Sequence, residues 1–324
     1  MIEPVPQGLT ELIPEELRDL KTPQTAIPRI AKDCRLTKQI EQALPLIPTH
    51  HRMTLTDARD ISFLQDSSVH LVLTSPPYWT LKDYRDTVGQ LGHIGDYEKF
   101  LSELDKIWQL CYRALVPGGR LICVVGDVCL ARRKNNGRHM VIPLHASIQE
   151  HCRKIGFDNL APIIWNKIAN AAYEAEGGGG FLGKPYEPNA VIKNDVEFIL
   201  MQRKPGAYRK PALPTRLLSI IPEASQRKWF QQVWVGLNGA STRCHPAPYP
   251  LELAERLIRM FSFVGDTILD PFAGTGTTNI AAAKTGRNSI GVEIDPTYFD
   301  HAWSRLEHET NRLFSGVTIE KVDE

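Results

Sequence analysis

The sequence is poor in cysteine, has no long apolar run and carries almost no net charge. Its six cysteines are scattered through 324 residues without a CxxC pair, so neither a zinc site nor a disulfide framework is indicated. We expect these cysteines to be reduced and mostly buried. No segment approaches the roughly eighteen apolar residues of a membrane helix, and the N-terminus lacks the basic start and apolar stretch of a signal peptide. We therefore expect a soluble cytoplasmic protein that binds neither a membrane nor a metal.

A formal net charge of +1 excludes a uniformly basic coat for nucleic acid. Positive charge is concentrated in two segments instead. Residues 131–139 carry no acid and four permanent positive charges, those of Arg132, Arg133, Lys134 and Arg138. Residues 203–228 carry one acid and seven Lys or Arg residues, which include Arg209, Lys210 and Arg216. Each segment alone is compatible with a solvated loop, and together they are candidates for phosphate contacts.

The pattern from residue 53 onward alternates between short apolar runs and amphipathic segments of helical spacing. With 42% hydrophobic residues, the chain can bury a large core. The strands are expected at residues 69–74, 121–125, 161–165, 196–202, 267–269 and 289–294. The helices are expected at residues 97–115, 142–154, 251–261, 277–284 and 296–313. This alternation predicts an α/β fold with a mostly parallel sheet and helices on both faces.

The first candidate site is the segment SPPY at residues 75–78, directly after a predicted strand. Prolines at these positions fix φ and remove N–H donors. The turn therefore offers the Ser75 hydroxyl and the Pro76 carbonyl to an amino group, and the Tyr78 ring can stack on a base. Taken alone, the segment is compatible with an ordinary proline turn.

The second candidate site is the segment DPFAGTGTT at residues 270–278, which also follows an apolar run. Gly274 and Gly276 open a helix directly after a strand, so backbone N–H groups can approach a ligand closely. A dinucleotide fingerprint would need a third glycine where this chain has Asn279, so a pyrophosphate ligand is disfavoured. Glu293 ends the next strand, where such sheets hydrogen-bond ribose hydroxyls. These features indicate a nucleoside cofactor.

In this order, the two segments resemble the amino-methylating DNA methyltransferases of the permuted (beta) class, in which the catalytic segment precedes the cofactor loop. The resemblance covers roughly residues 50–310 and rests on TSPPYW at 74–79, HPAPYP at 245–250 and DPFAGTG at 270–276. It implies a Rossmann-like fold, S-adenosyl-L-methionine as cofactor and double-stranded DNA as partner. The chain would be a prokaryotic protein that associates with the nucleoid when it acts.

The resemblance also implies roles for individual residues. The catalytic turn consists of Ser75, Pro76, Pro77 and Tyr78. Acceptors outside the ring plane favour a more tetrahedral amine and direct its lone pair at the methyl group, and the base must leave the duplex to reach it. The residues expected around the cofactor are Asp57, His245, Pro246, Asp270, Pro271, Phe272, Ala273, Gly274, Gly276, Thr277 and Glu293.

Two of these acids have an alternative interpretation. Asp270 can lie near the methionine end of the cofactor or hold the Pro-Phe-Ala turn through backbone N–H groups, and both can be true. Asp57 matches an aspartate near the adenine amino group, but an acid in a strand-to-helix turn is also a common N-cap.

Serine at the first position of the catalytic turn favours cytosine N4 as the target, because relatives with aspartate or asparagine there mostly methylate adenine N6. N6-adenine methylation by the same class of enzyme is the alternative. An RNA or protein methyltransferase, or an inactive nucleic-acid-binding module, is the next alternative. The sequence leaves open the recognition site, a homodimer and a cognate restriction endonuclease.

Composition divides the chain into five segments. Residues 1–50 are expected to form an N-terminal arm, residues 51–202 the catalytic half of the α/β domain and residues 241–315 its cofactor-binding half. The basic stretch at residues 203–240 lacks both periodicities and is expected to be a target-recognition insertion. Residues 316–324 are expected to be a tail, and the glycine run at 177–180 a mobile loop.

Overall fold

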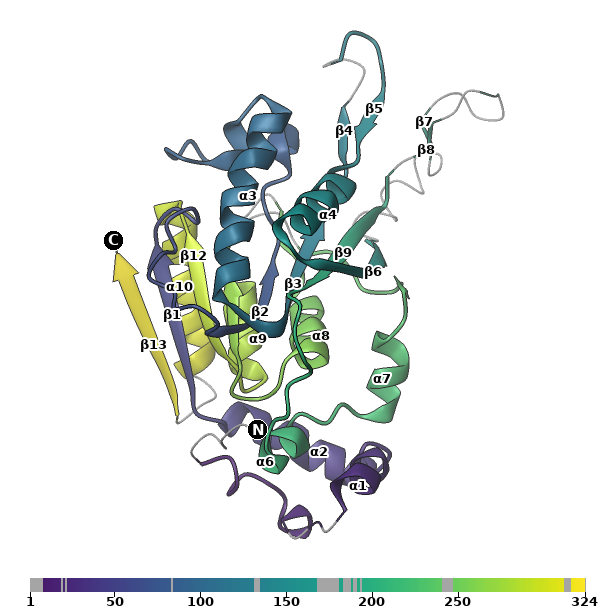
Figure 1. Cartoon of the computed structure of the whole chain (residues 1–324), viewed down its shortest axis with the longest axis vertical. Coiled ribbons are helices and arrows are strands. Elements are labelled where there is room, and N and C mark those ends of the chain that lie inside the picture. Colours follow the sequence, from purple (N-terminus) through teal and green to yellow (C-terminus); the bar gives the residue numbers. More distant parts are fainter. Residues whose placement is uncertain are drawn as a thin grey trace.

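A nine-stranded sheet forms the centre of the protein (Figure 1). The computed structural model describes residues 8–18, 20, 22–82, 84–130, 135–167, 181–182, 188, 191–192, 194–240, 247–311 and 316–323. The strands of the sheet, in chain order, are β1 (Thr49–Leu55), β2 (Val69–Thr74), β3 (Leu115–Val125), β6 (Asp158–Asn166), β9 (Val196–Arg203), β10 (Val233–Trp234), β11 (Thr267–Asp270), β12 (Asn288–Glu293) and β13 (Val317–Asp323).

The sheet is mostly parallel, as the sequence predicts. Its strand order is β10-β6-β9-β3-β2-β11-β12-β1-β13. Only β9 runs against its neighbours, β3 and β6, and the other neighbouring strands are parallel. The carboxyl ends of β1, β2, β11 and β12 therefore meet at one edge of the sheet, where loops of parallel sheets form ligand sites.

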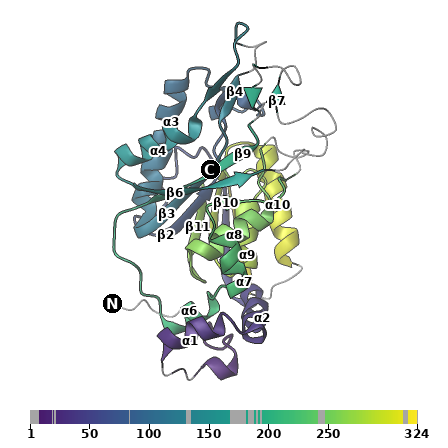
Figure 2. The same ribbon diagram turned by 90° about the vertical axis from the view of Figure 1, so that its right-hand side faces the viewer.

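Helices cover both faces of the sheet (Figures 1 and 2). On one face, α3 (Tyr97–Ala114) and α4 (Leu144–Ile155) pack against strand residues such as Val72 and Val125. On the other face, α8 (Leu251–Phe261) and α9 (Thr277–Lys284) pack against the alternate residues, such as Leu73 and Val124. The long helix α10 (Pro296–Asn311) contacts α9. The prediction of a sheet covered on both faces is confirmed.

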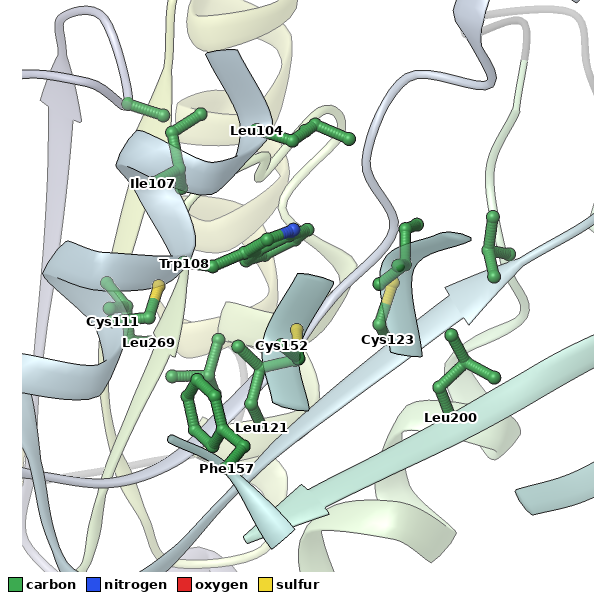
Figure 3. Close-up of a cluster of buried hydrophobic side chains, with 14 of the residues drawn as sticks. Leu104, Ile107, Trp108, Cys111, Leu121, Cys123, Cys152, Phe157, Leu200 and Leu269 are labelled. Atoms are coloured by element: carbon green, nitrogen blue, oxygen red, sulfur yellow. The ribbon is translucent and has the colours of Figure 1, made fainter. Parts of the chain in front are cut away.

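Helix α3 shows how the sequence dictates this packing. Asp96 precedes the helix and accepts a hydrogen bond from the Lys99 N–H at 2.7 Å, which satisfies one of its first free donors. The apolar positions predicted for this helix, from Phe100 to Cys111, all lie in the core. Figure 3 shows Trp108 at the centre of that core, beside Cys111, Cys123 and Cys152. Burial raises the pKa of the Cys111 and Cys123 thiols.

Smaller elements surround the sheet. The helices α1 (Pro23–Ile30) and α2 (Cys34–Ala43) share one apolar cluster with α6 (Leu213–Leu218). The remaining helix and strands are α7 (Glu223–Trp229), the antiparallel pair β4 (Val128–Leu130) and β5 (Met140–Ile142), and the antiparallel pair β7 (Phe181–Leu182) and β8 (Val191–Ile192). Short 3₁₀ helices occur at Glu15–Leu17, Leu44–Leu46, Trp79–Leu81 and Leu91–His93.

The structure differs from the sequence prediction at residues 316–324. Instead of a tail, β13 pairs in parallel with β1 over seven positions, from Thr49↔Val317 to Leu55↔Asp323. It provides hydrogen-bond partners for the outer edge of β1, which would otherwise be unpaired. The glycine run at 177–180 lies outside the described residues. Among the helices that the structure describes, none is long and apolar enough to cross a bilayer.

Candidate active site

A cleft lies where the carboxyl ends of β1, β2, β11 and β12 meet. Its empty volume is about 540 Å³, part of which is open to solvent. Sequence analysis predicted six of its lining residues, namely Asp57, Ser75, Pro77, Pro271, Phe272 and Glu293. The catalytic turn and the cofactor loop are almost two hundred positions apart in the sequence, yet both line this one cleft. They meet because β2 and β11 are neighbours in the sheet.

The catalytic turn is compact and mostly buried. Pro76, Pro77 and Tyr78 are buried, while Ser75 is partly exposed to the cleft. The Ser75 hydroxyl donates a hydrogen bond to the Tyr78 hydroxyl at 3.3 Å. Burial raises the pKa of Tyr78, which therefore remains a neutral phenol. A flat, uncharged ring beside a small hydroxyl suits the stacking of a base and the orientation of its amine.

Trp79 follows the turn in a left-handed backbone conformation, with a φ of +46°. That conformation is strained for a bulky residue. It is held by a hydrogen bond from the indole N–H to the Ile94 carbonyl at 2.8 Å and by an edge-on contact with Tyr97. Trp79 thus anchors the chain that leaves the catalytic turn.

Asp270 holds the two motifs together. Its carboxylate is 1% exposed and accepts hydrogen bonds from the hydroxyls of Thr74 (2.6 Å), Thr278 (2.5 Å) and Tyr249 (3.1 Å) and from the Phe272 N–H (3.1 Å). Burial raises the pKa of Asp270, and these donors act in the opposite direction. The carboxylate does not line the cleft. These contacts are the ones expected if Asp270 holds the Pro-Phe-Ala turn.

The glycine loop, residues 271–276, connects β11 to α9 beside the cleft. Gly274 and Gly276 adopt φ values of +53° and +73°, which favour glycine, and α9 begins directly after them. The Gly274 N–H donates to the Glu293 carboxylate at 2.8 Å. Pro271 and Phe272 line the cleft, and Ala273, Gly274, Gly276 and Thr277 follow them at the start of α9. Direct contact of these four residues with the cofactor stays a prediction.

Glu293 presents a buried carboxyl group at the cleft. It is 7% exposed and accepts hydrogen bonds from the backbone N–H groups of Gly274, Ile294 and Asp295. Burial raises the pKa of Glu293 to about 7, although the three N–H groups act to lower it. The group can therefore change protonation near neutral pH. Its position at the end of β12 is the one predicted for a ribose ligand.

Asp57 lines the cleft and also makes the contacts of a turn-capping residue. It accepts a hydrogen bond from the Arg59 N–H at 2.9 Å. The Arg59 guanidinium forms ion pairs with both Asp57 and Glu103. The hydrogen bond to Asp57 is the main cause of the raised pKa of Arg59. Asp57 is thus held in place beside the cleft. It caps a turn and not a helix, because residues 58–68 contain turns and no helix, and its role near the adenine amino group stays a prediction.

A segment between the catalytic turn and α3, which no sequence pattern indicated, forms one wall of the cleft. Tyr84, Gly89 and Gln90 line it. The Thr87 hydroxyl fastens this segment to the buried Asp295 carboxylate at 2.6 Å. No periodic pattern marks these residues, and their only signal is that they follow the catalytic turn closely in the chain.

Of the residues predicted to contact DNA, Arg209, Lys210 and Arg216 follow β9 and lie at the edge of the sheet opposite the catalytic turn. Arg209 donates to Asp266 at 2.7 Å, directly before β11 begins, and Arg216 in α6 bonds Gln24. Figures 1 and 2 show α6 at the opposite end of the molecule from β4. These basic residues lie away from the cleft because β9 runs antiparallel to its neighbours and carries the chain to the opposite edge of the sheet, and their contact with DNA stays a prediction.

Of the other basic segment, the structure describes residues 135–139. Arg138 is exposed in the turn between β4 and β5, and β4 follows β3 at the carboxyl edge. Arg132, Arg133, Lys134, His245 and Pro246 lie outside the described residues. The part of the chain that the structure describes contains no group of three or more His, Cys, Asp or Glu residues that could hold a metal ion.

The family model of the DNA methylases (N6_N4_Mtase) matches residues 69–304. The match extends from β2, before the catalytic turn, into α10, which follows Glu293. The chain therefore belongs to this family. The resemblance inferred from the motifs is confirmed.

Curated relatives agree with the family. The chain is 40% identical over 279 residues to the type II methyltransferase M.MjaI of Methanocaldococcus jannaschii, covering 77% of this chain and 88% of that protein. It is 34% identical over 298 residues to the type II methyltransferase M.MthZI of Methanothermobacter thermautotrophicus, covering 85% and 81% of the two proteins.

Solved structures share the fold. TTHA0409 of Thermus thermophilus, in complex with S-adenosyl-L-methionine, matches with a TM-score of 0.70 and 51% identity over 84% of this chain and 98% of that chain. The cytosine-N4-specific PvuII DNA methyltransferase matches with a TM-score of 0.55 and 18% identity over 85% of this chain and 98% of that chain. The second likeness concerns the fold alone.

Proposed function

We propose that the protein transfers a methyl group from S-adenosyl-L-methionine to the exocyclic N4 of cytosine in duplex DNA, after the base has left the stack. One observation carries this proposal: Ser75, expected to act on the amine, and Glu293, expected to bind the ribose, line the same cleft. Membership of the DNA methylase family supports S-adenosylmethionine-dependent DNA methylation, and the 51% identical TTHA0409 was solved with that cofactor.

The residues of the cleft fit this cofactor. The buried Glu293 carboxyl group can accept hydrogen bonds from the ribose hydroxyls once it is ionised, and Phe272, Val292 and Ile294 provide apolar walls for the adenine ring. When bound, the cofactor supplies an electrophilic methyl group. The cleft leads directly to the catalytic turn through Ser75 and Pro77.

The catalytic turn orients the target amine. A base amine is a poor nucleophile because its lone pair is delocalised into the ring. The Ser75 hydroxyl, which bonds Tyr78 in the structure, and the Pro76 carbonyl would accept the two N–H groups of the amine. Two acceptors outside the ring plane make the nitrogen more tetrahedral and direct its lone pair at the methyl group.

Our proposal of cytosine over adenine rests on Ser75 as the first residue of the turn. The test is to incubate the protein with tritiated S-adenosylmethionine and duplex DNA from a host without methylation, and then to identify the methylated nucleoside by mass spectrometry. N4-methylcytosine is expected. N6-methyladenine as the sole product would contradict the base assignment alone, whereas no transfer to DNA would contradict the proposed function as a whole.

We propose the same roles for the segments of the chain as the sequence indicates, except for the residues that contact DNA. Residues 51–202 would supply catalysis and residues 241–315 would bind the cofactor. DNA contacts would come from the exposed turn between β4 and β5, which carries Arg138, and not from Arg209, Lys210 or Arg216. The type II names of its relatives also support a cognate restriction endonuclease as a partner.

A further inference from the structure

Lys167 and Glu197 form a polar pair at the carboxyl edge of the sheet. The pair lies on the side of the catalytic turn away from the cofactor cleft. The strands whose carboxyl ends lead into the cleft, β11, β12 and β1, lie on one side of β2, and β3, β9 and β6 lie on the other. Lys167 directly follows β6, and Glu197 is the second residue of β9. Because β9 is antiparallel to β6, both residues lie at the edge that carries Ser75.

The pair is in contact and largely shielded from solvent. The Lys167 ammonium donates to the Glu197 carboxylate at 2.7 Å, and the two side chains are 23% and 11% exposed. The Lys167 N–H also donates to the Asp195 carbonyl at 3.0 Å, which fixes the backbone from which the side chain starts. An ion pair in this environment contributes little net stability, because desolvation offsets most of the attraction between the charges.

Glu197 faces the catalytic turn across Gly126. A Cβ atom at Gly126 would lie 3.4 Å from the Glu197 Cγ and 3.5 Å from the Tyr78 Cε2. Because position 126 is a glycine, it adds no side chain between the Tyr78 ring and the ion pair. A continuous series of neighbours therefore extends from Ser75 through Tyr78 and Glu197 to Lys167.

An ammonium group carries three N–H donors and no acceptor. Within the part of the chain that the structure describes, the hydrogen bonds of the Lys167 ammonium use one donor, toward Glu197. Cytosine and adenine share one chemical feature that such a donor can recognise, since each presents a ring nitrogen acceptor next to its exocyclic amine. A base that stacks on Tyr78 with its amine at Ser75 would have this acceptor at the edge of its ring.

We propose that Lys167 is a specificity-determining residue that donates a hydrogen bond to the ring acceptor beside the target amine, and that Glu197 is a positioning residue that fixes the Lys167 ammonium. This assignment rests on the proposed methylation of DNA. It adds the half of the site that recognises the base to the half that binds the cofactor.

The test compares two changes, one in the protein and one in the base. Once the methylated base has been mapped, a duplex substrate is prepared in which the ring nitrogen beside the amine is replaced by carbon. We expect Lys167→Met to lower kcat/KM for the natural duplex by about tenfold to a hundredfold, with the Kd for S-adenosylmethionine unchanged within about twofold. The modified base should lower the activity of the wild-type protein by a similar factor and that of Lys167→Met hardly at all.

Lys204→Met is the matched control, because Lys204 is also a partly buried lysine but bonds the Leu115 carbonyl at the opposite edge, at 2.7 Å. It should keep wild-type kcat/KM. Glu197→Gln preserves the size of the side chain and should show a smaller loss than Lys167→Met with the same dependence on the modified base. This variant carries the test if Lys167→Met fails to melt cooperatively.

A wild-type kcat/KM in Lys167→Met would overturn the assignment. So would independent effects, in which the modified base lowers kcat/KM by the same factor in Lys167→Met as in the wild-type protein. Either result would leave DNA methylation intact. If the wild-type protein methylates no DNA, the proposed function fails first and the assignment of Lys167 fails with it.

Discussion

We expect Glu293 to make cofactor binding depend on pH near neutrality. Its pKa of about 7 in the folded protein lies above the ordinary value of 4.5 because the group is buried. Ribose hydroxyls donate hydrogen bonds best to the ionised carboxylate. The affinity for S-adenosylmethionine should therefore rise as pH increases through 7 and should fall by up to about tenfold per pH unit below it.

Calorimetric titration of the cofactor from about pH 5.5 to about pH 8.5, a range that brackets a group titrating near neutrality, measures this dependence. Glu293→Gln cannot ionise, so its binding should be weaker above pH 7 and should no longer follow the transition. The stability of the cofactor-free protein should change in the opposite sense. The raised pKa gives a contribution that is fully present below pH 4.5 and is lost as pH rises through about 7.

Ser75→Ala removes the hydroxyl that we expect to act on the amine and not on the cofactor. The rate of methyl transfer in a single turnover with saturating DNA should fall by roughly a hundredfold or more, by analogy with the loss of one preorganised polar contact. The Kd for S-adenosylmethionine should stay at the wild-type value. An unchanged single-turnover rate would contradict the role of Ser75.

Thr278→Val tests the role of the buried Asp270. The Thr278 hydroxyl is one of four donors to this carboxylate, and its loss leaves a buried charge with less compensation. The free energy of unfolding in urea should fall by about 1–3 kcal/mol. Thr285→Val is the control, because this buried hydroxyl donates to the Ala281 carbonyl, which the Thr285 N–H also bonds. Equal losses in the two variants would argue against a special role for Asp270.

At the scale of elements, the direction of β9 places Arg209 at the edge of the sheet opposite the catalytic turn, so we expect Arg138 and not Arg209 to contact DNA. Arg138→Ala, in the turn between β4 and β5, should weaken DNA binding and reduce the salt dependence of log K by about one phosphate contact. Arg209→Ala should leave DNA binding unchanged. It should destabilise the fold, because Asp266 is 3% exposed and would lose its ion-pair partner.

Fluorescence anisotropy with a labelled duplex at several salt concentrations distinguishes the two variants, and thermal melting reports the loss of stability. The reverse outcome, with a reduced salt slope for Arg209→Ala alone, would restore the original assignment of residues 203–240 to target recognition.

Local sequence patterns predicted the main helices and strands, and together with the family resemblance they indicated six residues of the cleft. The predicted strands fall within β2, β3, β6, β9 and β11 and mostly within β12, because each combines an apolar run with a turn signal. The catalytic turn and the cofactor loop were predictable because proline fixes the backbone, while glycine permits conformations that a ligand site requires. Such information is local.

The features that were missed depend on contacts between distant residues. That Arg209 pairs with Asp266, and that Lys167 meets Glu197, follows from the direction of β9, which composition does not encode. The segment VTIE after residue 316 alternates apolar and polar residues, but it forms a strand because the edge of β1 is open to pairing. Likewise, the segment that contains Thr87 forms a wall of the cleft because the Thr87 hydroxyl bonds Asp295, which is distant in the sequence.

For the whole molecule, the strand order has a consequence for synthesis on the ribosome. The strands β1 and β2 follow one another in the chain, but β11 and β12 lie between them in the sheet. A nascent chain that has not reached residue 293 therefore has β1 separated from the other strands and no complete cleft. Pairing of such distant segments is slow compared with local folding. The protein consequently becomes able to bind its cofactor late, after most of the chain has left the ribosome.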